Sequence, residues 1–156
     1  MTLVTLGTQH QEFTRLLDYI EKSDLKGEII VQAGYTKYES KRMKIFNFIS
    51  YDEMEKYIDK SDLVITHAGT GSIVMPLKKD KKVIACARLS KFGEHVDDHQ
   101  VELVDVFYSE GYILKVDEDT SLNEVLKNIK DFKPKKFVSN TKKFIENLEQ
   151  EINCCI

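Results

Sequence analysis

The chain has 156 residues, 42% of them hydrophobic and 31% charged, with a formal net charge of −3. Such a chain folds as one domain with a core of its own, and the lack of a basic, aromatic-rich pattern argues against nucleic acid as a partner. No apolar run is long enough for a signal peptide or a membrane span, and Cys86, Cys154 and Cys155 form neither a zinc pattern nor a disulfide framework. We therefore expect a single cytoplasmic domain over residues 1–156.

Short β-rich runs follow one another along the chain. They are LVTLG (3–7), EIIVQAG (28–34), KIFNF (44–48), LVITHAG (63–69), KVIACA (82–87) and YILKV (112–116). Runs such as 63–69 and 82–87 are apolar without alternation, which is typical of strands covered on both faces in a parallel sheet.

Helical patterns lie between most of these runs. Residues 11–22 and 98–109 place apolar side chains at near-helical spacing, and Ser121 with Glu124 predicts a capping box that opens the helix LNEVLKNI. A last helix is expected over residues 137–150. Strands that alternate with helices form βαβ units, so the predicted fold class is α/β with a doubly wound parallel sheet.

A glycine-rich turn follows the fourth run. Its members are His67, Ala68, Gly69, Thr70, Gly71 and Ser72. Ligands of open parallel sheets bind beyond the carboxyl ends of the strands, where glycines let a ligand approach the backbone and the next helix offers free N–H groups to an anion such as phosphate. An ordinary capped turn explains these residues equally well. The turn is not a Walker loop, and Val74 replaces the third glycine of the dinucleotide fingerprint.

Two further loops are expected at the same edge of the sheet. Gly7 and Thr8 end the first run, and the loop after the fifth run contains Glu94, His95, Asp97, Asp98, His99 and Gln100. Carboxylates, imidazoles and amides can hydrogen-bond sugar hydroxyls, so a nucleotide-sugar is the predicted ligand, with its phosphates on the glycines.

Simpler roles stay open for several of these side chains. Asp98 could only cap a helix that starts near His99. A metal site made of His95, Asp98 and His99 is less favoured, because these residues lie too close together for a tetrahedral ligand set. His10 is interpreted first as a surface or capping histidine.

The segments THAGTGSI and DDHQVE together resemble the C-terminal, donor-binding half of family 28 glycosyltransferases. More narrowly, the chain is similar to the small catalytic subunit of two-subunit UDP-N-acetylglucosamine transferases of lipid-linked oligosaccharide synthesis, and to bacterial counterparts in capsule and exopolysaccharide assembly. The resemblance extends from VTLGTQHQEF to about Ile129.

This resemblance implies a Rossmann-like fold, the C-terminal half of a GT-B glycosyltransferase. It also implies inverting transfer of a hexose or N-acetylhexosamine from a UDP-sugar, with no metal or other cofactor. A membrane-anchored partner subunit would supply the acceptor-binding half and a polyprenyl-diphosphate-linked saccharide as acceptor. The chain would then work at the inner face of the cell membrane, held there by its partner.

The resemblance also assigns roles to residues. The segment from His67 to Ser72 would contact the diphosphate, Gly7 and Thr8 would border it, and His99 with Gln100 would contact the donor sugar. Glu94, His95 and Asp98 are further candidates for the substrate site. The general base is expected on the partner, with His10 or His95 as a local substitute.

One position departs from the family pattern. Many relatives carry a ribose-binding carboxylate where this chain has Met75, so either another residue such as Glu94 holds the ribose or the chain binds the nucleotide more weakly than its relatives do. Two other functions are compatible with the sequence: a noncatalytic activator subunit of a membrane-bound glycosyltransferase, and a nucleotide-binding regulatory module.

Overall fold

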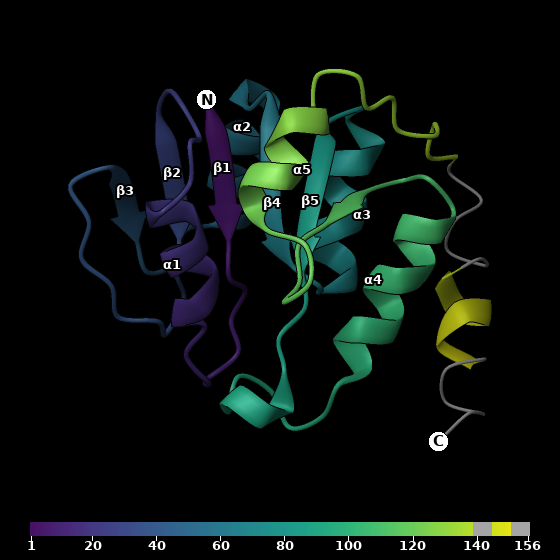
Figure 1. Ribbon diagram of the computed structural model, residues 1–156, viewed down its shortest axis with the longest axis horizontal. Helices are drawn as coiled ribbons and strands as arrows, with labels where there is room; N and C mark the ends of the chain where they lie inside the picture. Colours follow the sequence, from purple (N-terminus) through teal and green to yellow (C-terminus); the bar gives the residue numbers. More distant parts are fainter. Residues whose placement is uncertain (139–144, 151–156) are drawn as a thin grey trace.

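The computed structural model describes residues 1–138 and 145–150 (Figure 1). Its strands form one parallel sheet in the order β3-β2-β1-β4-β5-β6. The strands are β1 (Thr2–Thr5), β2 (Ile29–Gln32), β3 (Met43–Phe46), β4 (Leu63–His67), β5 (Lys82–Cys86) and β6 (Leu114–Lys115). This order is that of the Rossmann fold, in which the chain reverses its direction across the sheet between β1 and β4. The predicted doubly wound α/β class is confirmed.

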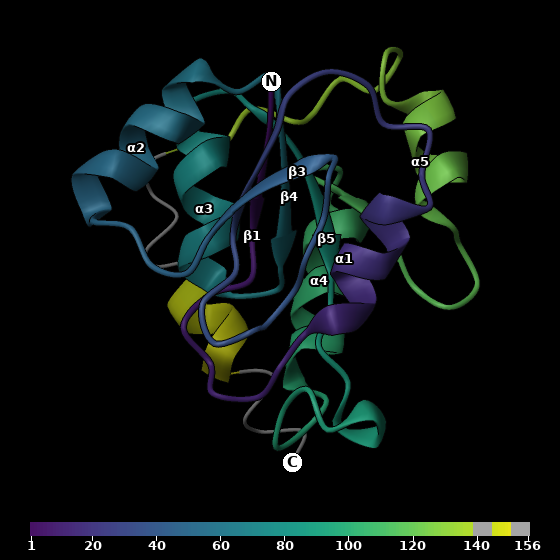
Figure 2. The same ribbon diagram turned by 90° about the vertical axis from the view of Figure 1, so that its left-hand side faces the viewer.

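Helices cover both faces of this sheet (Figure 2). They are α1 (Thr14–Glu21), α2 (Tyr51–Lys60), α3 (Thr70–Lys78), α4 (His99–Ser109) and α5 (Leu122–Asn128), with a short 3-10 helix, η1 (Ser90–Phe92). Side chains of α1 and α5 pack in one core cluster, and side chains of α2, α3 and α4 pack in the other.

Neighbouring residues of the central strands point into opposite clusters. Leu3 lies on the α3 side and Val4 on the α1 side, and Val64 and Ile65 divide in the same way. All four are fully buried. Burying one such side chain contributes about 1.5–3 kcal/mol, so both faces stabilise the sheet. This double burial explains why the strands show no polar alternation.

The helix ends differ in part from the prediction. The capping box of α5 is confirmed, since Ser121 N donates to Glu124 Oε2 at 2.8 Å and Ser121 Oγ accepts from Glu124 N at 3.3 Å. The predicted helix 11–22 begins only at Thr14, because Phe13 has a non-helical backbone, with φ −126° and ψ 55°; its N–H donates to Thr36 Oγ1 at 2.9 Å. Helix α2, opened by a capping box of its own, was not specified by the sequence analysis.

The predicted helix 137–150 is wrong at its start. Residues 137 and 138 are not helical, whereas residues 145–150 are. Phe137 is buried in the cluster on the α3 and α4 side, where Leu148 also packs. The middle of this prediction, residues 139–144, lies outside the described residues. Over the described ranges, none of the helices has both the length and the apolar character needed to cross a bilayer.

Candidate functional site

Three loops meet at the carboxyl edge of the sheet, where β1, β4 and β5 lie side by side. The loop after β1 carries Gly7 and Thr8, the turn after β4 leads from His67 into α3, and a longer loop with η1 connects β5 to α4. In Figure 1 this edge is the lower one, where η1 lies. The prediction that the three polar loops share one edge is therefore confirmed.

The imidazole of His67 lies between two of these loops. A Cβ atom added at Gly7 would come within 2.6 Å of the ring, and one added at Gly69 would come within 2.5 Å. Gly7 also has φ +75°, which favours glycine. Both glycines are therefore required by the packing of His67, whatever else they contact.

His67 is buried and neutral. Its Nδ1 lies 3.3 Å from the carbonyl oxygen of Thr5, which can only accept, so in this contact Nδ1 donates and Nε2 is left as the acceptor. Burial lowers the pKa of His67 to about 4, with the charges of Arg88 and His95 adding to the effect and the bond to Thr5 opposing it. The imidazole is thus uncharged near neutral pH.

The start of α3 is open toward this edge. Gly69 occupies the N-cap position and gives no side-chain cap. Gly71 is exposed, and a Cβ added there would meet nothing within 4 Å. The hydroxyls of Thr70 and Ser72 form no hydrogen bond with any described residue. The first turn of α3 therefore offers N–H groups, two hydroxyls and free space, and the buried Ala68 lies just before it.

Glu94 is not available to a ribose. Its side chain is buried, with 4% of its surface exposed, and both carboxylate oxygens pair with Arg15 at 2.9 Å. Oε2 also accepts from Leu89 N at 2.9 Å. The suggestion that Glu94 replaces the missing ribose carboxylate is wrong for this structure. Met75 itself packs against the core cluster of α2, α3 and α4.

Asp98 holds the turn before α4. It occupies the N-cap position without capping α4, and its Oδ1 instead accepts from Ser90 N at 2.8 Å and from Ser90 Oγ at 2.9 Å. These bonds lower the pKa of Asp98. The N–H of His99 is satisfied by Asp97 Oδ1 at 3.0 Å. The capping role expected of Asp98 therefore belongs to its neighbour.

The side chains of the loop before α4 differ in how many of their polar groups already have partners. Those compared are His95, His99 and Gln100. His95 Nδ1 accepts from Asp97 N at 3.3 Å and also lies 3.2 Å from Asp97 Oδ1. Gln100 accepts from Arg88 N at 3.1 Å through Oε1, and neither Gln100 Nε2 nor the His99 ring forms a hydrogen bond with a described residue. Among the residues that the structure describes, no three histidine, cysteine or acidic side chains are arranged to hold a metal ion.

His10 belongs to an aromatic group at the other end of the same edge. Its ring centroid lies 4.4 Å from that of Tyr35, which lies 5.1 Å from that of Phe48. The three residues follow β1, β2 and β3, and Tyr35 and Phe48 are about half exposed. His10 is exposed and lies four residues before α1, so it is a surface residue and not a helix cap.

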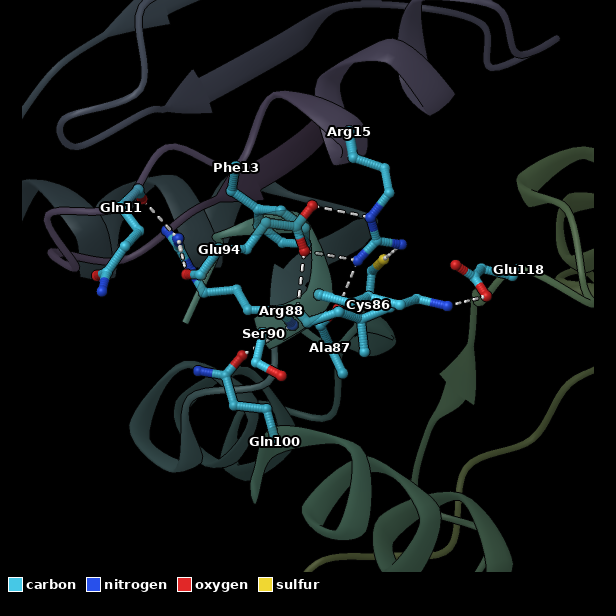
Figure 3. Close-up of polar contacts among 12 residues, drawn as sticks. Gln11, Phe13, Arg15, Cys86, Ala87, Arg88, Ser90, Glu94, Gln100 and Glu118 are labelled. Carbon is cyan, nitrogen blue, oxygen red and sulfur yellow. Dashed lines mark hydrogen bonds and ion pairs between the residues drawn. The ribbon is translucent and has the colours of Figure 1, made fainter. Parts of the chain in front are cut away.

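Two arginines that the sequence analysis missed connect the loops (Figure 3). Arg15, on α1, pairs with Glu94, and Arg88, just after β5, reaches backbone carbonyls of the loops after β1 and β5. Burial alone would lower the pKa of Arg15, but the hydrogen bonds and negative charge of Glu94 oppose this effect, and the net result is a raised pKa. The available signal was an arginine directly after a buried apolar strand.

A cavity of about 430 Å³ lies beside these loops, between α4 and the segment after β6. It is lined mainly by charged side chains, among them Arg15, Lys91, Asp98, Lys115 and Glu118. Lys91 and Glu118 form an ion pair of 2.7 Å at this cavity. It shares Asp98 with the candidate site and includes no residue of the glycine turns.

Comparison with known proteins decides the family. Residues 1–152 match the sequence pattern of the family described as "Glycosyltransferase family 28 C-terminal domain". The chain belongs to glycosyltransferase family 28. This membership confirms the resemblance seen in the glycine turn and the loop before α4.

Curated relatives of this family 28 chain include the same transferase subunit from several organisms. The UDP-N-acetylglucosamine transferase subunit ALG13 of Saccharomyces cerevisiae is 40% identical over 73 residues, which are 46% of this chain and 34% of that protein. The subunit of the same name in Candida glabrata is 30% identical over 116 residues, 72% of this chain and 56% of that protein. The chain thus spans between a third and somewhat over half of these relatives.

Solved structures show the same fold. The NMR solution structure of ALG13 covers 94% of each chain with a TM-score of 0.63 and 23% identity. The crystal structure of Acinetobacter baumannii MurG covers 82% of this chain and 40% of that chain, with a TM-score of 0.51 and 18% identity. The family 28 chain therefore has the Rossmann-like fold of one half of a GT-B glycosyltransferase.

Proposed function

We propose that this chain is the donor-binding catalytic subunit of a two-component, inverting glycosyltransferase. It moves a hexose or N-acetylhexosamine from a UDP-sugar to a saccharide on a polyprenyl diphosphate. A membrane-anchored subunit supplies the acceptor-binding half and holds the chain at the cytoplasmic face of the membrane. The observation that carries this proposal is the open first turn of α3 at the edge where β1 and β4 meet, in a family 28 domain.

The donor diphosphate fits this turn. Free N–H groups at the start of α3 and the positive end of its dipole stabilise phosphate oxygens, and Thr70 and Ser72 can donate further hydrogen bonds. The exposed Gly71 leaves room for a phosphate against the backbone. The same groups stabilise the charge that grows on the departing UDP, which requires no metal ion in principle.

The donor sugar is placed beside the diphosphate. His99 and Gln100 open α4, next to the glycine turn across β4 and β5, and Gln100 Nε2 and the His99 ring are free to bind sugar hydroxyls. The named relatives are UDP-N-acetylglucosamine transferase subunits, so UDP-N-acetylglucosamine is the first donor to test. The reported matches give no support to a capsule or exopolysaccharide setting.

A general base must remove the proton of the acceptor hydroxyl. We place this base on the partner subunit, which would hold the acceptor. Neither local substitute is arranged as a base in the free chain, because the Asp97 N–H donates to His95 Nδ1 at 3.3 Å, which places the proton of a neutral His95 ring on Nε2. His10 only stacks on Tyr35.

Calorimetric titration tests the donor site. We expect UDP and one UDP-sugar, among the N-acetylglucosamine, glucose and galactose forms, to bind the chain. Gly71→Val should weaken both by about tenfold or more, since a branched side chain would occupy the phosphate position. Lys78→Val, at the exposed far end of the same helix, is the matched control and should bind normally.

Other outcomes identify the alternative functions. The chain would be a noncatalytic activator if the partner alone bound the UDP-sugar. This chain by itself would then bind none, and Gly71→Val would not change binding by the pair. The chain would be a regulatory module if it bound the nucleotide but supported no sugar transfer when mixed with any membrane fraction. Equal binding by Gly71→Val and wild type would contradict the diphosphate site.

A further inference from the structure

Arg88 is the largest fully buried side chain of the chain's described part, with 1% of its surface exposed. Its guanidinium donates to three backbone carbonyls, at 2.7 Å to Leu6, 2.7 Å to Gln11 and 3.0 Å to Glu94. These carbonyls belong to the end of β1, the loop after β1 and the loop after β5. The guanidinium also stacks on Phe13, 4.9 Å from its ring centroid. One side chain thus joins two of the three site loops (Figure 3).

The arrangement is costly for stability. Arg88 forms no ion pair within the described residues, since the nearby Glu94 carboxylate is committed to Arg15 and Leu89. Burial lowers the pKa of Arg88 to about 10, an effect that the charge of Glu94 reduces. Its Nε has no hydrogen-bond partner in this part of the chain. A buried charge held by neutral groups stabilises less than apolar packing would, so its presence indicates a role beyond stability.

The backbone of Arg88 reaches the candidate sugar site directly. Its N–H donates to Gln100 Oε1 at 3.1 Å, across the whole loop between β5 and α4. Because Oε1 is held, the Gln100 amide has a fixed orientation, with Nε2 left to donate elsewhere. The guanidinium fixes the position of this backbone relative to β1. The position of Gln100 therefore depends on the same anchor as the loop.

We infer that Arg88 is a positioning residue, which locks the loop of residues 88–100 onto the end of β1 and thereby sets Gln100 against the donor sugar. This inference rests on the proposed donor-binding function. It separates two parts of the donor: the diphosphate, whose main contacts are with the first turn of α3, and the sugar, which depends on Arg88 through Gln100. Loss of Arg88 should then reduce the extra affinity that the sugar adds to UDP.

The test compares Arg88→Lys with Arg42→Lys in the full chain. Lysine keeps the charge but cannot direct donors to three carbonyls at once. Arg42 is a matched control, because it also donates to backbone carbonyls, those of Ile20, Glu21, Ser23 and Leu25, at the end of α1 away from the site. The measured quantity is the ratio of the dissociation constants of UDP and of the preferred UDP-sugar.

We expect Arg88→Lys to lower this ratio about tenfold, the equivalent of one or two sugar hydrogen bonds, with UDP affinity changed by no more than about twofold. Arg42→Lys should leave the ratio unchanged. An unchanged ratio in Arg88→Lys, which includes equal losses of affinity for UDP and for the UDP-sugar, would overturn the inference while leaving the proposed function intact. Absence of UDP-sugar binding by the wild-type chain, alone and with its partner, would overturn the proposed function itself.

Amide hydrogen exchange of the ligand-free chain gives a second measurement. Arg88→Lys should speed exchange about tenfold at residues 88 and 89, whose amides bond to Gln100 and Glu94, because the loop opens more often. Arg42→Lys should not affect these amides. Unchanged protection in Arg88→Lys would show that the guanidinium does not hold the loop, and would overturn the inference without any ligand.

Discussion

At the residue scale, the contact of Gly69 with His67 makes a sharp prediction. Gly69→Ala should lower the free energy of unfolding by about 1–3 kcal/mol, because the new Cβ would lie 2.5 Å from His67 Nε2. Urea denaturation measures this loss. Gly71→Ala, two residues further on in α3, meets no neighbouring atom and should leave stability unchanged or raise it by up to about 1 kcal/mol, because alanine is favoured over glycine in a helix.

A double mutant shows whether His67 is the cause. In a His67→Ala background, Gly69→Ala should cost almost nothing, since the ring that obstructs the Cβ is gone. The same cost in both backgrounds would mean that the conformation of the turn, and not the imidazole, requires glycine at this position.

His67 also makes stability depend on pH. Its pKa is about 4 in the folded chain and about 6.5 when unfolded, so the unfolded chain binds the proton first. The stabilisation is complete above about pH 6.5 and is lost as the pH falls through about 4, by up to about 3 kcal/mol. The difference in unfolding free energy between wild type and His67→Gln should therefore change over this range. A constant difference would contradict a buried neutral imidazole.

At the element scale, the capping box of α5 is remote from the site. Ser121→Ala removes the bond from Glu124 N to Ser121 Oγ and should lower the free energy of unfolding by about 1 kcal/mol. UDP binding should stay unchanged, because α5 lies beside α1 and away from the glycine turns. Thermal or urea denaturation with a parallel titration measures both effects. A loss of binding without a loss of stability would contradict this separation.

Elements were predictable where local signals agreed. Short β-rich runs identified the strands of the described residues, and the spacing of serine and glutamate identified the start of α5. The start of α1 was not predictable from local pattern, since the N–H of its N-cap residue, Phe13, bonds to the side chain of Thr36, 23 residues away. The apolar Phe137 suggested a helix, yet it packs in the core from a non-helical segment.

At the scale of the whole molecule, the sequence predicted which loops meet at one edge of the sheet but not which contacts hold them together. A parallel sheet brings the ends of neighbouring strands to one edge, so the glycine turns and the loop before α4 could be placed together from their order alone. The bonds from Arg88 to Gln11 and Leu6 join residues 77 and 82 positions apart. No spacing rule reveals such contacts, and Glu94 was misassigned for the same reason.

Buried polar side chains connect the loops of this edge in a continuous series. Gln32 Nε2 donates to the carbonyls of Gly7 and Asn47, both at 3.1 Å, His67 fills the space between Gly7 and Gly69, and Arg88 joins the loops after β1 and β5. The conformational entropy of ordering these loops is therefore lost during folding and not during binding. For the donor and partner subunit proposed above, we expect binding without reshaping of the site, so that donor loading and subunit assembly occur in either order.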